Sequence, residues 1–160
     1  MSRIRGSGVM ADLIRSKDWS SHELGTPETW PEQLVFVINT ALDSEFPTHF
    51  YWGPSHCSFY NDGFLRIIGN KHPSLLGSRG DDGFADVWDR LGVTVNLAFG
   101  GKTSYYSNVR LDSTRNGYLE ECYFTFSHSP MRAADGQILG VHAPVSNGLN
   151  QFPRLMTCIF

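Results

Sequence analysis

The hydrophobic period of the chain changes at Pro47, and few folds are compatible with the order of elements that results. Before Pro47, apolar residues recur at helical spacing, which predicts a short amphipathic helix over 9–17 and a second helix over 31–42. After it, two short β-prone stretches, 48–52 and 58–61, flank the turn Gly53-Pro54-Ser55 and predict a hairpin.

Further helices and then further strands follow this hairpin. One or two helical turns are expected over 64–68, and a longer helix over 86–99 ends at Gly100-Gly101. The last third predicts a meander of three strands, 103–111, 118–129 and 138–145, joined by turns that contain Asn116-Gly117 and Asp135-Gly136. This order is typical of an α+β domain with helices on one face of an antiparallel sheet.

Length and charge favour a single globular domain that does not bind nucleic acid. A chain of 160 residues with 41% apolar residues can bury a sizeable core without a metal or a disulfide. Its formal charge of −3 lacks the excess of cationic side chains that neutralises phosphates.

The cysteines and the apolar runs favour a cytoplasmic protein without direct membrane contact. Cys57, Cys122 and Cys158 are odd in number and widely spaced, which disfavours both a disulfide framework and a structural zinc site. The longest apolar run, 34–38, is far shorter than the roughly 20 residues that span a bilayer. The first ten residues lack the apolar region of a secretory signal.

A series of short motifs resembles the PAS sensory domains, in the version found in bacterial sensor histidine kinases and related two-component proteins. These motifs are Trp52-Gly53-Pro54, Tyr60-Asn61-Asp62, Ile68-Gly69-Asn70-Lys71-His72-Pro73, Leu76-Gly77, Val87-Trp88, the stretch 120–130, and Asp135-Gly136 followed by Gly140. Upstream, Asp18-Trp19-Ser20, Leu24-Gly25 and Trp30-Pro31 resemble the cap that precedes the domain in this version. The resemblance covers residues 18–145, and its specificity comes from the order and spacing of the motifs.

The resemblance implies a five-stranded antiparallel sheet in the order 2-1-5-4-3, with helices that enclose a pocket on one face and an N-terminal helical cap. It divides the chain into a flexible lead-in with a short helix (1–17), a cap and helix (18–46), the PAS core (47–146) and an irregular tail (147–160). The tail contains Gly148 and Pro153 where a helical connector is expected, so the chain is interpreted as an excised domain, a truncated product or a stand-alone remnant.

The resemblance also implies a function and partners. It indicates a non-catalytic input module that binds a small molecule or a partner, forms a homodimer and relays to a downstream kinase or effector domain. The expected mechanism is a change in how the sheet packs against the helices 9–17 or 31–42, driven by the difference in ligand affinity between two arrangements.

Sequence motifs for cofactors and catalysis are incomplete. The stretch 100–103 ends like a phosphate-binding loop, but Asn96 stands where that loop needs glycine. The helix 86–99 has no histidine of the kind with which haem-binding relatives hold iron, and the chain has no Asn-Cys-Arg-Phe sequence for a flavin adduct. No Gly-x-Ser-x-Gly or zinc-protease pattern occurs, so the cofactor stays unassigned and the chain is predicted not to be an enzyme.

Four reactive side chains are interpreted as structural. Glu120 and Glu121 are adjacent on a predicted strand, so they face opposite ways and cannot form an acid–base pair. An ion pair with Arg110 or Arg115 is the favoured interpretation. The two internal cysteines, at positions 57 and 122, are expected to be small buried apolar residues.

Aromatic residues supply the candidate pocket. On the strand 118–129 one alternating face is wholly apolar, and it is assigned to the pocket side. The complete set of ligand-pocket candidates is Trp52, Tyr60, Asn61, Phe84, Trp88, Val95, Cys122, Tyr123, Phe124 and Phe126. Such a set can also pack as a filled core, which leaves a protein–protein adaptor without a ligand as one alternative. A small-molecule enzyme on a cone-like α+β scaffold is the other, and it requires an ionisable residue with a perturbed pKa in the pocket.

Overall fold

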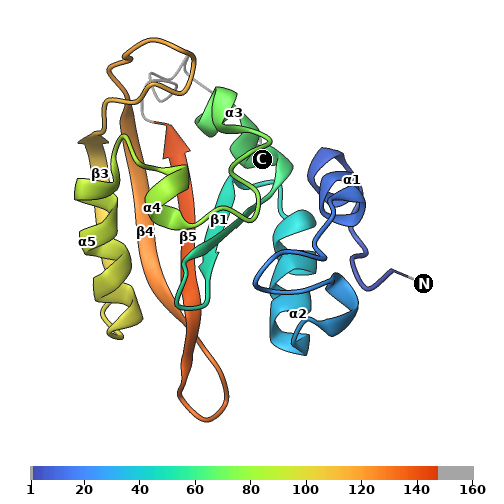
Figure 1. Cartoon of the computed structure of the whole chain (residues 1–160). Coiled ribbons are helices and arrows are strands. Elements are labelled where there is room, and N and C mark those ends of the chain that lie inside the picture. The colour runs from blue at the N-terminus through green and yellow to red at the C-terminus, as the bar shows by residue number, and fades with distance from the viewer. Residues whose placement is uncertain (1, 148–160) are drawn as a thin grey trace, which may run out of the picture.

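The computed structural model describes residues 2–147, so most of the predicted tail 147–160 and Cys158 lie outside the described residues. The helices are α1 (Val9–Ser16), η1 (Pro27–Thr29), α2 (Glu32–Leu42), η2 (Asp62–Phe64), α3 (Leu65–Ile68), η3 (Gly69–Lys71), α4 (Gly80–Gly83) and α5 (Trp88–Phe99). The strands are β1 (Thr48–Trp52), β2 (Cys57–Tyr60), β3 (Ser104–Arg110), β4 (Tyr123–Arg132) and β5 (Ile138–Asn147), as Figure 1 shows. Within residues 2–147 no helix is both long enough and apolar enough to cross a membrane.

The five strands form one antiparallel sheet in the order β2-β1-β5-β4-β3, which confirms the predicted order. β1 and β2 form the expected hairpin, and its turn begins at Gly53, whose φ of 67° lies in the left-handed region that favours glycine. On its other side β1 pairs with β5, and a β-carbon at Gly140 would collide with the carbonyl oxygen of Tyr51. Glycine at this position therefore lets the first and last strands approach.

The fourth strand is shifted along the chain from its predicted bounds. It begins at Tyr123 rather than Tyr118, because residues 111–122 leave the sheet as a loop held by an isolated antiparallel bridge between Ser113 and Glu120. It also continues past Pro130 to Arg132. β3 pairs with β4 only as far as His128. Beyond it β4 has a neighbouring strand on one side only, so Pro130, which has no N–H to donate, fits there.

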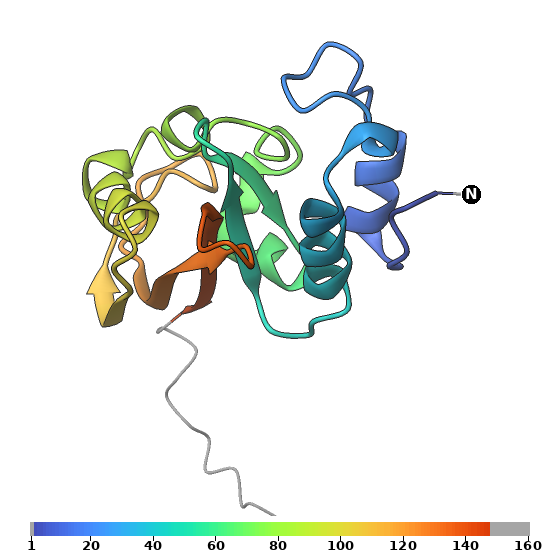
Figure 2. The same ribbon diagram turned by 90° about the horizontal axis from the view of Figure 1, so that it is seen from below.

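Helical segments pack on both faces of the sheet. Successive residues of β1 point alternately to one face and to the other. His49 and Tyr51 point toward α5 and share a cavity with its Leu91. Phe50 points to the opposite face, where it shares a groove with Val37 of α2. Figure 2 shows α1 and α2 beside β1 and β2, well separated from α5. All five residues of β1 are buried as a result.

The N-terminal cap is joined to the outer face of β1 and β2 by stacked aromatic rings. Trp19 stacks on Phe59 at 5.8 Å between ring centroids, and Phe59 stacks on Phe50 at 5.2 Å. The beginning of the chain also packs here instead of forming the flexible lead-in that its glycines suggest. Ile4 is buried, and the Arg3 guanidinium donates hydrogen bonds to the carbonyl oxygens of Pro27 and Trp30.

Two polar side chains at the end of the first hairpin connect the cap to the sheet. The Asp62 carboxylate accepts hydrogen bonds from the backbone N–H groups of Val9 and Met10, which belong to the first turn of α1. The fully buried Asn61 side chain accepts from Thr48 N and Phe64 N, and its amide donates to three carbonyl oxygens at residues 41, 44 and 46. Asn61 therefore connects the end of α2, β1 and η2.

Candidate functional site

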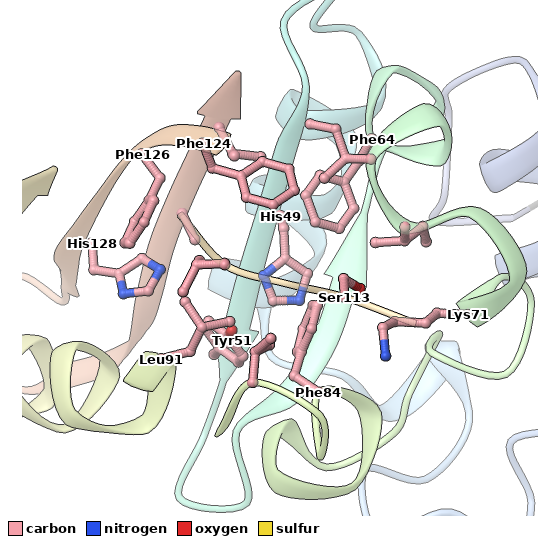
Figure 3. Close-up of a pocket in the computed structure, with 16 residues that line it drawn as sticks. His49, Tyr51, Phe64, Lys71, Phe84, Leu91, Ser113, Phe124, Phe126 and His128 are labelled. Carbon is pink, nitrogen blue, oxygen red and sulfur yellow. The ribbon is translucent and has the colours of Figure 1, made fainter. Parts of the chain in front are cut away.

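A cavity of about 80 Å³ lies between the inner face of the sheet and the helices that follow β2. Its walls are contributed by β1, β4 and β5 on one side and by η2, α3 and the segment from Phe84 to α5 on the other. The residues that line it are His49, Tyr51, Phe64, Ile67, Ile68, Lys71, Phe84, Val87, Leu91, Leu111, Ser113, Phe124, Phe126, His128, Ala143 and Val145. Figure 3 shows His49 near the centre, with His128 toward one side and Lys71 toward the other.

The centre of the cavity wall is the His49 imidazole, which is only 2% exposed and is surrounded by aromatic rings. Its ring lies 4.3 Å from Tyr51, 5.2 Å from Phe64 and 5.3 Å from Phe84, measured between centroids. Its Nε2 atom is buried and has no hydrogen-bond partner among the described residues. Burial, together with the nearby His128, holds the pKa of His49 well below its usual value, so the ring is neutral at pH 7.

The second imidazole, His128, has a hydrogen-bond partner. Its Nδ1 lies 2.7 Å from the Thr94 hydroxyl, which in turn donates to the carbonyl oxygen of Leu91 within α5. The Thr94 hydroxyl has a single proton, and it donates this proton to Leu91. Its oxygen is then left to accept a hydrogen bond from the Nδ1–H group of His128. Burial lowers the pKa of His128 to about 4, which makes this ring neutral as well.

Polar groups at the rim satisfy one another. Lys71 Nζ lies 2.7 Å from Asp86 Oδ1, and the hydroxyl of Ser113 and the N–H of Thr114 donate to Asp86 Oδ2 at 3.1 and 3.2 Å. Burial by itself raises the pKa of Asp86, but the hydrogen bonds from Lys71 and Thr114 outweigh it, and the pKa lies below its usual value. Asp86 therefore stays ionised and ties η3 to the loop 111–122.

The same loop is anchored by a second ion pair. Arg115 Nε lies 3.0 Å from Glu120 Oε2, and Arg115 Nη1 donates to the carbonyl oxygen of Ile67 at 2.8 Å. Glu121 forms a separate and more exposed ion pair with Arg110 at 3.4 Å. Both glutamates therefore form the ion pairs that the sequence analysis favoured, although they lie in the loop 111–122 and not on a strand.

The structure brings three of the predicted pocket residues together at the cavity: Phe84, Phe124 and Phe126. Because Phe124 and Phe126 share a face of β4, their assignment to the pocket side follows from simple alternation.

The other candidates lie elsewhere in the fold. Asn61 and Tyr60 are buried but do not line the cavity; Tyr60 lies opposite His49 in the sheet, and its hydroxyl lies 3.1 Å from His72 Nδ1. Trp52 borders a groove on the outer face with α2, and the Tyr123 hydroxyl donates to Glu121 outside the cavity. The remaining candidates, Trp88, Val95 and Cys122, are not among the lining residues.

His49, Tyr51 and His128 are site residues that the sequence reasoning missed. His128 has a readable signal, because it continues the alternation of Phe124 and Phe126 on the inner face of β4. β1 offers no such signal, because its residues are bulky and buried on both faces.

The cavity wall contains two imidazole side chains with perturbed pKa values. Burial lowers the pKa of both imidazoles, so both are neutral at pH 7, and a perturbed ionisable residue in the pocket is what the enzyme alternative requires. Burial raises the pKa of Cys57 to about 12 and also raises that of Cys122, so both buried thiols stay protonated. Among residues 2–147, no three histidine, cysteine, aspartate or glutamate side chains cluster in a way that could hold a metal ion.

Comparisons with known proteins identify the fold of the chain and do not assign it to a family. No protein-family model and no curated protein matches the chain. A light-oxygen-voltage (LOV) protein from Rhodobacter sphaeroides superposes with a TM-score of 0.57 at 14% identity, covering 76% of this chain and 69% of that one. A phage VqmA solved as a complex with DPO superposes at 0.53 with 16% identity, over 71% of this chain and 52% of that one.

A third structure, an RNA-binding LOV receptor, superposes at 0.52 with 13% identity over 70% of this chain. This chain spans only about a third of that receptor, 32% of its length. At these identities the similarity shows a shared sheet and helix arrangement, and it assigns neither ligand nor partner.

Proposed function

Because the chain has the PAS/LOV type of fold, we propose that it is a non-catalytic sensory module that binds a small molecule in the cavity around His49. The observation that carries this proposal is a mostly apolar, partly open cavity of about 80 Å³ whose wall includes a buried imidazole with an unpaired ring nitrogen. A filled core, as in the adaptor alternative, would have no reason to keep an unpaired polar atom there.

The ligand signal would cross the sheet through β1. This strand contacts the cavity with His49 and Tyr51 and contacts the cap with Phe50, which stacks on Phe59 and through it on Trp19. A ligand that shifts β1 would thereby change how α1 and α2 pack on the outer face. The size of the response is limited by the difference in ligand affinity between the two arrangements.

We infer that the receiver of this signal is a homodimer connected to a downstream kinase of a two-component system. Phe36 of α2 is 72% exposed and stands at the rim of apolar grooves that also contain Val37 and Met131. One surface thus carries both a projecting ring and an apolar groove, which suits a self-complementary contact between two copies.

Protein partners in the cytoplasm are favoured over nucleic acid for this module. The net charge of −3 does not supply the cationic surface that nucleic-acid binding needs. Cys57 and Cys122 are free and buried, which fits a reducing compartment.

Native mass spectrometry of the protein purified from cells tests both parts of the proposal, because it reports bound small molecules and oligomeric state together. We expect a dimer carrying a small molecule of a single ring's size. Ala143→Leu, which projects a larger side chain into the cavity from β5, should release the molecule while the protein stays folded. An empty wild-type protein that dimerises normally would contradict the ligand-binding proposal and favour the adaptor.

A further inference from the structure

The polar side chains that line the cavity differ in whether they have hydrogen-bond partners, and this difference indicates what kind of molecule fits. His128 is hydrogen-bonded to Thr94, and Lys71 is paired with Asp86. His49 is enclosed by aromatic rings, and its Nε2 has no partner. The ligand therefore has an unmet hydrogen-bonding position to satisfy at the His49 imidazole.

We infer that the cavity selects an uncharged, single-ring heteroaromatic molecule whose polar ring atom forms a hydrogen bond with the His49 imidazole. This inference rests on the proposed function, because it names the class of ligand for the same cavity. It assigns His49 as the residue that determines specificity.

The size and shape of the cavity limit the ligand to a single small ring. An apolar cavity of about 150 Å³ in another protein binds benzene, so a cavity of about 80 Å³ admits a single ring only where its walls move, and a fused-ring cofactor or a haem would need a much larger displacement. The rim residues Ile67 and Leu91 are only partly buried and can adjust by small side-chain movements. Phe64 stacks on the His49 ring and Phe84 meets it at an interplanar angle of 89°, so an aromatic occupant would meet aromatic rings beside His49.

The charges around the cavity favour an uncharged ligand. Lys71 is the only lining residue with a fixed charge, and Asp86 neutralises it at 2.7 Å. Asp86 in turn accepts from Ser113 and Thr114, so recruiting the lysine to an anionic ligand would leave a partly buried carboxylate without its cation. A cationic ligand would find no free carboxylate in the cavity wall, because Asp86 is already paired with Lys71.

The Nε2 atom of His49 is both unpaired and buried beneath the rings of Tyr51, Phe64 and Phe84, so a ligand that binds it must displace part of this wall. The other buried polar atom without a partner, Ser58 Oγ, belongs to a residue that does not line the cavity and cannot serve the same ligand. A neutral imidazole offers one N–H and one bare nitrogen, so it can bind either an acceptor or a donor.

Three small probes separate these possibilities in the 160-residue chain at pH 7.5. Pyridine carries an acceptor, pyrrole carries a donor, and benzene has the same flat shape without either. Dissociation constants are measured by NMR titration for the wild type and for His49→Leu, an apolar replacement of similar size. His49→Gln restores a hydrogen-bonding group, and His142→Leu changes a histidine of β5 that lies on the outer face and lines a different groove.

In the wild type, we expect either pyridine or pyrrole to bind more tightly than benzene. In His49→Leu this preference over benzene should fall by about fivefold, which corresponds to about 1 kcal/mol for one hydrogen bond. His49→Gln should recover part of this preference, and His142→Leu should keep all of it. The imidazole ¹⁵N resonances of wild-type His49 should also shift with that heterocycle and not with benzene, which tests the contact even where a variant fails to fold.

Two results would overturn the inference in different ways. Equal affinities relative to benzene in the wild type and in His49→Leu would show that the cavity binds rings without using His49. Binding of none of the probes to the wild type, together with an empty protein in native mass spectrometry, would overturn the proposed function itself.

Discussion

Acidification from pH 7 to pH 5 should destabilise the protein through His128, and the size of the loss follows from the burial of this ring. Its pKa is lowered to about 4 in the folded chain, whereas a histidine in the unfolded chain titrates near its usual value of 6.5. At pH 5 the unfolded state therefore binds a proton that the native state does not. The stabilisation is present above about pH 6.5 and is lost as the pH falls toward 4. With these two values, the free energy of unfolding falls by about 2 kcal/mol between pH 7 and pH 5.

Other histidines change stability in the same direction, so the contribution of His128 must be isolated by substitution. Burial also lowers the pKa values of His49, His56 and His142. His128→Asn removes the titrating ring and keeps a hydrogen-bonding group near Thr94. Ser127→Asn, a neighbour on the opposite face of β4, introduces the same side chain without removing a titrating group.

Urea denaturation at pH 7 and pH 5 measures the free energy of unfolding of all three proteins. The wild type and Ser127→Asn should lose the same amount on acidification, and His128→Asn should lose about 2 kcal/mol less. An equal loss in His128→Asn and the wild type would refute the reasoning, because it would mean that His128 takes up its proton in the native state.

Three further expectations follow from single contacts. Asn61→Ala should lower the free energy of unfolding by about 2 to 4 kcal/mol in urea denaturation, because it leaves several buried backbone groups without partners. Arg115→Ala should make limited proteolysis of the loop 111–122 about tenfold faster, because it removes about 1.4 kcal/mol of local stability. The control Arg110→Ala, which removes the exposed ion pair, should leave the rate of proteolysis unchanged. Phe36→Glu should convert the proposed homodimer to a monomer in size-exclusion chromatography with light scattering. It should change the stability of the monomer by less than about 0.5 kcal/mol, because the ring is largely exposed; a persistent dimer would refute that interface.

Local signals predict most of the elements within a residue or two. The helical stripe after Gly8, the hairpin turn at Gly53 and the helix that ends at Gly100 all lie where the pattern places them. These signals depend on neighbours a few residues apart, so they can be read from one segment at a time. β4 is the exception, because its beginning depends on where the loop 111–122 closes through Arg115 and Glu120, and this closure joins residues that no local pattern connects.

The candidate site was predicted where alternation could be read and missed where it could not. β4 carries apolar side chains on one face and mixed side chains on the other, so Phe124 and Phe126 were assigned to the pocket side. β1 is covered on both faces, so its aromatic residues give no indication of direction. Trp52 therefore joined the candidates although it lies on the outer face, and His49 was left out although it lies at the centre of the cavity.

From the sequence alone, the order of helices and strands and the inward face of β4 could be determined, because both arise from periodicity and turn residues within short segments. The tertiary structure decided which face of β1 meets the cavity, because that depends on packing by α5 on one side and by the N-terminal cap on the other. It also decided that His49 is left without a hydrogen bond while His128 has Thr94. Whether a buried polar atom is paired depends on contacts between distant segments, and these exist only once the chain has folded.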